Sequence, residues 1–317
     1  MDKNKKVVTF GGGTGLSALL RGLKKFPLDI TAVVTVADDG RSTGRLREEF
    51  NVPAVGDIRQ VIVALSETEP LVQNLLNYRF KTNDDLNGHA LGNLLLTGLI
   101  DVAGSFSEGI ESLGKVLNLK GTVLPVTEEN VTLIGQMEDG KIIEGEHNIT
   151  DSLSKIKKVY YKQQPKVLDK VIEEIKSADL IVLSMGSLFT SIIPNLICDE
   201  VRKAIDESDA EIMYVCNMVT QPGETDKFKV SDHINTLNEY LGNKKVSIVV
   251  VNNGEIDEEL KEKYLNLEQK EPVIYDIETL EKMDVKVIAK NLITLEDGTL
   301  KHDTVKLGFT IFSYLIM

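Results

Sequence analysis

The feature that most constrains this chain is a strand, a glycine-rich loop and a helix that follow one another near the N-terminus. Residues 6–10 form a short apolar run, residues 11–15 include four glycines, and residues 16–25 carry leucines at helical spacing. A strand that enters a helix through glycines lets backbone N–H groups approach an anion closely. This segment therefore predicts a parallel α/β unit with an anion-binding loop.

The same loop fits the dinucleotide-binding motif GxGxxG/A through Gly13, Gly15 and Ala18, and Asp38 follows at the end of the next predicted strand. The match favours a nucleotide ligand, with NAD as one alternative. A tight turn without a ligand is the structural alternative, and a P-loop is excluded because no GK[ST] follows. The candidate ligand contacts here are Gly12, Gly13, Thr14, Gly15, Asp38 and Asp39.

Further apolar, β-branched runs alternate with helical patterns along the chain. They occur at residues 30–37, 122–126, 179–184, 211–216 and 246–252. Such alternation predicts a Rossmann-like α/β fold, with a mostly parallel sheet and helices on both faces. Because no repeat, low-complexity tract or proline-rich linker interrupts it, we expect a single α/β nucleotide-binding domain over residues 1–317.

One region departs from this alternation. Residues 131–149 have the pattern of a β-hairpin whose turn is supplied by residues 138–140. We therefore expect a β-rich excursion from the main sheet over about residues 131–165. The apolar run at 307–317 is too short to span a membrane, and predicts a buried helix or strand.

Charge is distributed unevenly. The chain has 36 basic and 49 acidic residues, a net charge of −13, yet six of its seven arginines lie in the first 80 residues. A chain this acidic should repel nucleic acid and anionic membrane surfaces, so we expect no nucleic-acid partner. Arginine is suited to forked contacts with phosphate, so the clustering predicts a local anion site.

Residues 40–47 contain three of these arginines together with two hydroxyl side chains and two glycines. This composition favours an anion-binding loop. The alternative is a solvated charged segment, or salt bridges to Glu48 and Glu49 at helical spacing. The candidate contacts of this segment are Arg41, Ser42, Thr43 and Arg45.

Other polar residues lie at predicted strand ends or on helix faces. Asp57 has the position of a helix N-cap, or of a ligand for a hydroxyl group or a metal. His89 and Asn93, four residues apart, share a helix face and belong either to a buried polar network or to a pocket floor. Residues 185–187 form a second strand-to-helix turn. The remaining candidates are Gly186, Ser187, Leu188, Asn217, Thr220, Gln221 and Lys301.

Several function classes are excluded. The two cysteines, Cys198 and Cys216, form no CxxC motif, so disulfide and zinc chemistry are not expected. We assign no metal ligands. The polar N-terminus does not resemble a signal peptide, and no apolar stretch reaches the length of a membrane span. A cytoplasmic location is therefore expected.

Five motifs occur in an order that resembles a known family. They are Gly-Gly-Gly-Thr-Gly at 11–15, the segment 38–47, Gly-Asp-Ile-Arg at 56–59, Gly-His with Gly-Asn-Leu at 88–94, and Thr-Gln-Pro-Gly-Glu-Thr at 220–225. Together they are similar to the bacterial gluconeogenesis factor family (YvcK-like), which shares a superfamily with the 2-phospho-L-lactate transferases (CofD-like). The resemblance covers about residues 6–305.

The resemblance implies a cytoplasmic protein with roles in gluconeogenic growth, cell shape and wall synthesis, and binding of UDP-N-acetylglucosamine or UDP-glucose. In the transferases it implies magnesium-dependent transfer of phospholactate from a nucleoside diphosphate to a hydroxyl, with Asp57 at an acceptor-contacting position. Two departures stand out. Met185 occupies a position where members often have proline, and Lys301 one where they often have arginine.

These observations leave four hypotheses. The first is a UDP-sugar-binding regulator, whose partners would include cell-wall or metabolic enzymes. The second is a magnesium-dependent transferase that uses Asp57. The third is an NAD-binding protein, which gives the arginine-rich segment no role. The fourth is a scaffold whose ligand only sets its affinity for a partner. The oligomeric state is left open, a homodimer included.

Overall fold

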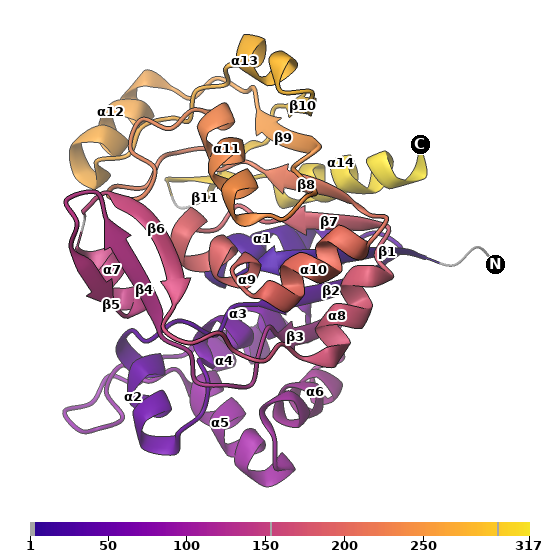
Figure 1. Cartoon of the computed structure of the whole chain (residues 1–317). Coiled ribbons are helices and arrows are strands. Elements are labelled where there is room, and N and C mark those ends of the chain that lie inside the picture. Colours follow the sequence, from indigo (N-terminus) through magenta and orange to yellow (C-terminus); the bar gives the residue numbers. More distant parts are fainter. Residues whose placement is uncertain (1–3, 153, 297) are drawn as a thin grey trace.

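Seven parallel strands form the central sheet of the computed structural model, which describes residues 4–152, 154–296 and 298–317. Their order across the sheet is β10-β9-β8-β7-β1-β2-β3 (Figure 1). The predicted Rossmann-like parallel sheet is therefore confirmed. The strand bounds are Lys5–Gly11 (β1), Leu28–Val34 (β2), Thr122–Pro125 (β3), Leu180–Leu183 (β7), Glu211–Val215 (β8), Ile248–Asn252 (β9) and Lys286–Lys290 (β10).

The direction in which the chain builds this sheet reverses between two central strands. From β1 the chain proceeds through β2 to β3 at one edge, whereas from β7 it proceeds through β8 and β9 to β10 at the other. The loops that follow β1 and β7 therefore diverge to opposite faces of the sheet. In a doubly wound sheet this reversal opens a crevice at the carboxyl ends of the strands, where ligands bind.

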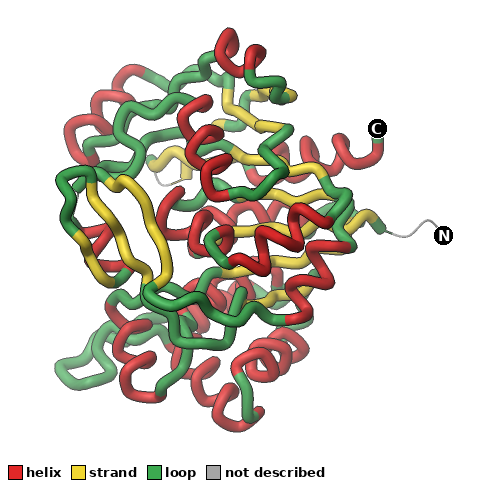
Figure 2. Tube along the Cα trace, in the orientation of Figure 1, coloured by secondary structure: helices red, strands yellow, loops and turns green. Residues whose placement is uncertain are grey.

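Helices cover both faces of the sheet (Figures 1 and 2). Helix α1 contacts α3 and α14 on one face, and α8 contacts α10 on the other. Right-handed crossovers explain the two layers, since β1→β2 and β7→β8 run in opposite directions across the sheet. The bounds are Gly13–Leu23 (α1), Gly56–Leu65 (α3), Asp169–Lys176 (α8), Leu188–Ile192 (η1), Ile193–Leu196 (α9), Asp199–Glu207 (α10), Val230–Tyr240 (α11), Glu258–Glu268 (α12), Ile277–Lys282 (α13) and Thr304–Ile316 (α14).

Four further helices lie together at the bottom of Figure 1, beyond the β3 edge. Their bounds are Arg41–Phe50 (α2), Pro70–Asn77 (α4), Leu91–Ala103 (α5) and Phe106–Val116 (α6). Helix α5 contacts α2, α3, α4 and α6, so it is the centre of this group. The apolar face of α5 that carries Leu96 and Ile100 is buried there. The group is attached to the sheet through α6, which contacts β3, and through α3, which contacts β2 and β3.

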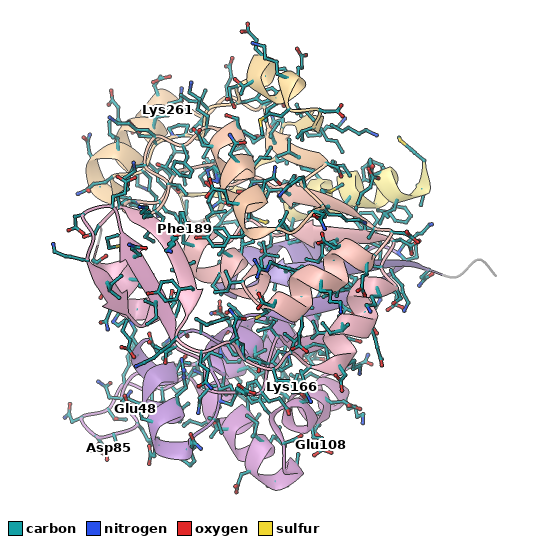
Figure 3. All side chains as sticks on the ribbon, viewed as in Figure 1. Glu48, Asp85, Glu108, Lys166, Phe189 and Lys261 are labelled. Carbon is teal, nitrogen blue, oxygen red and sulfur yellow. The ribbon has the colours of Figure 1, made fainter. Side chains whose placement is uncertain are left out.

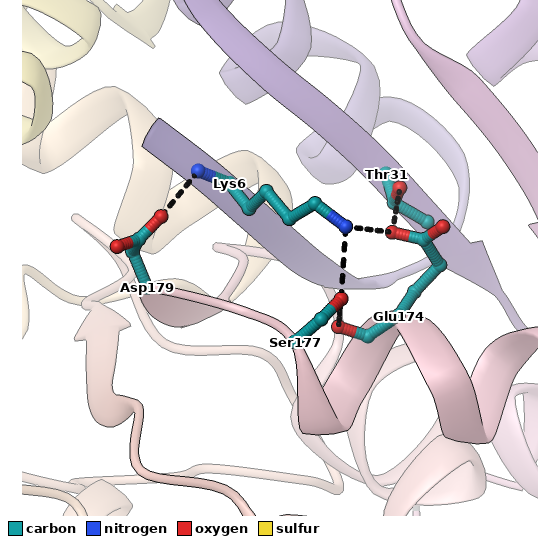
Figure 4. Close-up of polar contacts among 5 residues, drawn as sticks. All are labelled: Lys6, Thr31, Glu174, Ser177 and Asp179. Carbon is teal, nitrogen blue, oxygen red and sulfur yellow. Dashed lines mark hydrogen bonds and ion pairs between the residues drawn. The ribbon is translucent and has the colours of Figure 1, made fainter. Parts of the chain in front are cut away.

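Polar contacts hold the strands in register near their amino ends (Figure 4). Nζ of Lys6 donates to Oγ of Ser177 at 2.9 Å and lies 3.8 Å from Oε2 of Glu174, which also accepts from Oγ1 of Thr31 at 3.3 Å. The backbone N–H of Lys6 donates to Asp179 at 2.7 Å. These contacts tie the residue before β7 to β1, and the end of α8 to β1 and β2, on the side of the sheet opposite the crevice.

The predicted β excursion is present as a three-stranded antiparallel sheet in the order β5-β4-β6. Strands β4 (Leu133–Met137) and β5 (Ile142–Glu144) form the expected hairpin, with Gly140 at φ +87° in the turn. The sequence did not predict the third strand, β6 (Ile156–Tyr161), or helix α7 (Glu146–Asp151) between β5 and β6. The first residue of helix α7, Glu146, lines the cavity described below.

A second small hairpin precedes the C-terminal helix. Strand β11 (Ile293–Glu296) pairs antiparallel with β12 (Thr299–His302), and α14 follows directly. The apolar run at 307–317 is thus largely helical. Helix α14 crosses α1 at two glycines, because a Cβ on Gly22 would overlap the carbonyl of Thr304 and one on Gly308 would lie 2.6 Å from the backbone of Gly22.

This close crossing gives a test of the fold. Replacing Gly22 with alanine should lower the free energy of unfolding by about 1–3 kcal/mol, because the added methyl group must displace the backbone of α14. The matched control is Gly98→Ala in α5, where a Cβ meets nothing within 4 Å. That change should raise stability by about 0.5–1 kcal/mol through helix propensity. Urea denaturation of both variants measures the two effects, and equal shifts would contradict the crossing.

Candidate functional site

A cavity of about 820 Å³ opens at the carboxyl ends of β1 and β7, where the strand order reverses. This volume lies within the range of small-molecule sites. The structure brings eleven of the predicted ligand contacts to its lining. They are Gly12, Gly13, Thr14, Gly15, Asp38, Asp57, Gly186, Ser187, Asn217, Gln221 and Lys301.

The two predicted glycine loops meet at the centre of this cavity. A Cβ on Gly15 would lie 2.6 Å from the carbonyl oxygen of Met185, so only glycine allows the first turn of α1 to approach the loop after β7. Beyond this contact, Ala18 and Arg21 continue along one face of α1 and also line the cavity. Both strand-to-helix turns therefore contribute backbone to a single site.

Asp57 lies beneath the first glycine loop. A Cβ on Gly12 would overlap its carboxyl group, and the backbone amide of Gly13 stabilises its charged form. Burial nevertheless raises the pKa of Asp57 to about 7, with a further contribution from the negative charge of Asp38. Asp57 therefore occupies the side of the loop where the motif alone would place a phosphate.

A second carboxyl group reaches the cavity from the β excursion. Glu146 is the first residue of α7, and burial raises its pKa to about 8, with the charges of Asp38 and Asp57 adding to the effect. Oγ1 of Thr150 donates to its Oε1 at 3.2 Å. Asp38, Asp57 and Glu146 thus form one electrostatically coupled group, which we call the acidic end of the cavity.

Asp39 positions helix α7. Its Oδ1 accepts a hydrogen bond from the backbone N–H of His147 at 2.8 Å. Gly145 packs so closely that a Cβ would lie 2.6 Å from Oδ2 of Asp39, and its φ of +96° suits glycine. Asp39, a predicted ligand contact, is therefore absent from the cavity lining and fixes the orientation of Glu146.

Three cationic side chains also line the cavity, and none of them contributes to the pKa values of Asp57 and Glu146. Arg21 comes from α1, Lys270 from the segment after α12, and Lys301 from β12. We call these three residues the cationic end, and Glu296 of β11, the strand that pairs with β12, also lines the cavity. The cationic end is assembled from segments far apart in the sequence. Such a group of cations suits an anionic ligand such as a diphosphate.

Two buried contacts fix the segments that carry these lysines. Oγ1 of Thr220 accepts from the backbone N–H of Glu271 at 2.9 Å, which holds the segment beside Lys270. Nε2 of His302 lies 3.2 Å from the carbonyl oxygen of Cys216 and is therefore the protonated nitrogen. Burial lowers the pKa of His302 to about 4, so the ring is neutral. Thr220 is thus a support for the site, outside the cavity lining.

The second loop has a carboxylate of its own. Oγ of Ser187 lies 2.7 and 2.6 Å from the two carboxyl oxygens of Glu224, whose Oε2 also accepts from the N–H of Phe189 at 3.2 Å. Phe189 lies in the interior in Figure 3. Burial raises the pKa of Glu224, and the bond from Ser187 opposes that rise. The hydroxyl of Ser187 is therefore already engaged.

Two amide side chains in the lining present acceptors. Nδ2 of Asn217 donates to the carbonyl of Gly186 at 3.1 Å, and this bond fixes the side chain. Among the described residues, Oδ1 of Asn217 and Oε1 of Gln221 have no hydrogen-bond partner. Buried acceptors of this kind are satisfied in most proteins, so both atoms are candidates to receive a donor from a ligand.

The arginine-rich segment differs from its prediction. Residues Arg41–Phe50 form helix α2, where the sequence favoured a loop. Ser42, Thr43 and Leu46 lie on its buried face, whereas Arg41 and Arg45 are exposed. Amphipathic spacing within the segment outweighed the loop-forming tendency of its glycines. None of the four candidate contacts of this segment lines the cavity.

The guanidinium groups of this helix bind backbone instead. Arg45 donates to two carbonyl oxygens in residues 85–87, at 3.0 and 2.5 Å. Arg47 donates to the carbonyls of Asp38 at 2.9 Å and Val131 at 2.6 Å. Figure 3 shows Asp85 near the outer edge of this part of the molecule. Arg45 and Arg47 therefore stabilise loops through their backbone carbonyls. Of the six arginines in the first 80 residues, Arg21 alone lines the cavity.

The remaining predicted contacts belong to a buried network between α2, α3 and α5. Oγ of Ser42 lies 2.9 Å from Nδ1 of His89 and accepts from Nδ2 of Asn93 at 3.3 Å. Arg59 donates to Asn93 at 2.9 Å and also to Asn77. Burial lowers the pKa of His89. His89 and Asn93 are thus part of a core network. Leu188, another predicted contact, is fully buried in η1 and does not line the cavity.

Four charged lining residues were missed by the sequence analysis: Arg21, Glu146, Lys270 and Glu296. Glu146 lies within the predicted excursion, where no motif marked it. Lys270 follows a helix distant from every motif. Arg21 could have been found, because it stands two helical turns after Thr14 and so shares a face of α1.

Within the described residues, no group of three or more His, Cys, Asp or Glu side chains is arranged to hold a metal ion. The acidic end is therefore not a ready-made magnesium site, and we derive no step through a metal there. No helix in the described ranges is long and apolar enough to cross a bilayer.

The fold and the cavity define a doubly wound α/β protein with a ligand site at the switch point of its sheet. The family model for 2-phospho-L-lactate transferase CofD matches residues 7–293. The chain is 43% identical over 316 residues to the gluconeogenesis factor of Bacillus subtilis (strain 168), covering 99% of each protein. It is 46% identical over 310 residues to that of Halalkalibacterium halodurans, covering 98% of this chain and 96% of the relative.

A solved structure is also similar to this chain in fold and sequence. The X-ray crystal structure of protein BH3568 from Bacillus halodurans superposes with a TM-score of 0.94 at 45% identity, covering 98% of this chain and 100% of that one. The chain belongs to the CofD family, in the group of the gluconeogenesis factors. The resemblance noted from the five motifs is therefore confirmed.

The raised pKa of Glu146 predicts how stability depends on pH. In the unfolded chain this carboxyl group loses its proton near the ordinary glutamate pKa of 4.5, whereas the folded one keeps it until about pH 8. The folded state binds more protons in this window, so stability falls as the pH rises through it. Glu146→Gln mimics the protonated group, and should raise the unfolding free energy at pH 8.5 by about 1–3 kcal/mol.

Urea denaturation at pH 5 and pH 8.5 measures this effect. The gain should shrink by at least about half at pH 5, where the penalty on wild-type Glu146 is small. The control is Glu144→Gln on β5, an exposed residue that pairs with Lys162 at 2.6 Å, and it should change stability little at either pH. A gain of the same size for Glu146→Gln at both pH values would contradict the assignment.

Proposed function

We propose that this protein is a regulator that binds a UDP-sugar, UDP-N-acetylglucosamine or UDP-glucose, in the cavity at the switch point. The proposal includes the roles that the family resemblance implies, in gluconeogenic carbon metabolism and in cell shape. The protein would act in the cytoplasm, through cell-wall or metabolic enzymes as partners.

The observation that carries the proposal is the separation of charge within one cavity of about 820 Å³. The cationic end, with Arg21, Lys270 and Lys301, suits a diphosphate. The acidic end suits groups that donate hydrogen bonds, such as the hydroxyls of a sugar. A nucleotide sugar combines a diphosphate with neutral hydroxyl-bearing rings in one molecule. Nucleic acid lacks this combination, and the net charge of −13 opposes it.

The unpartnered amide oxygens support a base contact. Oδ1 of Asn217 and Oε1 of Gln221 are acceptors in the lining. A uracil ring presents an imide N–H, which is a donor of the required kind.

Isothermal titration calorimetry with the two UDP-sugars tests the proposal. We expect saturable binding in the micromolar range, and NAD binding weaker by at least about tenfold. The absence of heat with both UDP-sugars at high micromolar concentration would overturn the proposal. Equal affinity for NAD would favour the dinucleotide alternative.

A charge reversal at the cationic end gives a second test. Lys301→Glu removes one of three cations and adds an anion, so it should weaken UDP-sugar binding by about tenfold or more. The control is Lys282→Glu on α13, an exposed residue outside the cavity lining. It makes the same change in net charge and should leave the affinity within about twofold. Equal losses in both variants would point to a non-specific charge effect.

Transferase activity is a second candidate function, favoured by the CofD family match and by the pKa of about 7 at Asp57. A carboxylate poised near neutral pH suits a general base. Asp57 would accept the proton of an acceptor hydroxyl while that oxygen forms a bond to the terminal phosphorus, and the nucleoside monophosphate would leave. Turnover in the presence of magnesium would support this function if the Asp57→Asn variant loses it. If wild-type protein shows no turnover, the binding regulator is the better description.

A further inference from the structure

Among the residues that the structure describes, the β excursion contributes one side chain to the cavity lining, that of Glu146. Backbone hydrogen bonds of the two residues that flank Glu146 in the sequence hold it in this position. Gly145 donates from its backbone N–H to the carbonyl of Leu133 at 2.8 Å, and the N–H of His147 donates to Asp39 at 2.8 Å. The excursion is therefore anchored to β4 and to the loop after β2, and it fixes the position of one ligand-facing carboxyl group.

The surroundings of Glu146 restrict what chemistry a ligand can bring to it. Asp38 and Asp57 are close enough to raise its pKa, and burial acts in the same direction. An anionic ligand group at this end would meet like charges in a partly water-excluded cavity, which is costly. A neutral hydroxyl or amide N–H would instead donate to a carboxyl oxygen.

The cationic end of the cavity would give a nucleotide sugar a fixed direction. The cations there attract a diphosphate, whereas the acidic end repels one. A nucleotide sugar with its diphosphate toward Arg21, Lys270 and Lys301 can therefore direct only neutral groups toward Glu146. Gly15 and Met185, where the two glycine loops meet, also line this cavity.

We propose that Glu146 is the specificity residue that selects a neutral, hydroxyl-bearing sugar and rejects an anionic one. The proposal rests on the function proposed above and refines it. The ionised form of Glu146 accepts a hydrogen bond from the sugar, and its negative charge excludes sugars that carry a carboxylate. The nucleoside diphosphate part of the ligand is bound independently of it.

Three ligands and two variants test this inference by calorimetry at pH 8.5, above the pKa of about 8 of Glu146, so that most of its carboxyl groups are ionised. UDP, UDP-glucose and UDP-glucuronic acid share the nucleotide and differ in the sugar. Glu146→Met removes both carboxyl oxygens and keeps the side-chain length and helix propensity. The control is Glu144→Met, the same change at an exposed position on β5.

We expect wild-type protein to bind UDP-glucose about tenfold more tightly than UDP-glucuronic acid. Glu146→Met should weaken UDP-glucose binding by about tenfold, change UDP binding by less than about twofold, and bring the two sugars to within about threefold of each other. Retained UDP binding also shows that the variant is folded. Glu144→Met should match the wild type.

The outcomes separate this inference from the proposed function. If Glu146→Met weakens UDP and UDP-glucose equally, or leaves the preference between the sugars intact, then Glu146 is not the specificity residue, although the proposed function stands. If wild-type protein binds none of the three ligands, the proposed function fails and this inference fails with it.

Discussion

The contact between the first turn of α1 and the loop after β7 is the constraint on which the site depends. It occurs where the strand order reverses, and Gly15 allows the backbone there to come within touching distance of Met185. Because of this approach, two loops that leave the sheet toward opposite faces enclose a single cavity. A side chain at residue 15 would separate the loops, and the two halves of the cavity would no longer share a ligand.

Charge within that cavity is arranged at a cost to stability. Asp57 and Glu146 have pKa values raised to about 7 and about 8, so both destabilise the folded state whenever they are ionised. A fold selected for stability alone would place neutral side chains here. Unfavourable burial of titratable groups in a cleft is typical of functional sites, and supports a binding role for the acidic end.

How far the site follows from the sequence differs from residue to residue. Gly13 and Gly186 were found because a glycine between a strand and a helix indicates a backbone that must turn sharply or approach another group closely. Arg45 was assigned to the ligand because arginine suits phosphate, yet backbone carbonyls of a neighbouring loop satisfy it. The type of a residue indicates what its side chain can bind, but not which partner lies within reach in the folded chain. Glu146 was not predicted as a site residue, because an isolated glutamate in a hairpin region belongs to no recognisable motif.

The sequence by itself determined the parallel α/β fold, the hairpin at 131–149 and the two glycine turns. These depend on local periodicity and on backbone geometry that few residues permit. Only the tertiary structure decided which polar residues share the cavity. Lys301 reaches the cavity from the β11–β12 hairpin, and Glu146 reaches it from helix α7 of the β excursion. Contacts such as that of His147 with Asp39 hold these segments in place. Contacts between distant segments leave no regular spacing in the sequence, so the charges of the site could be assigned only after the chain had folded.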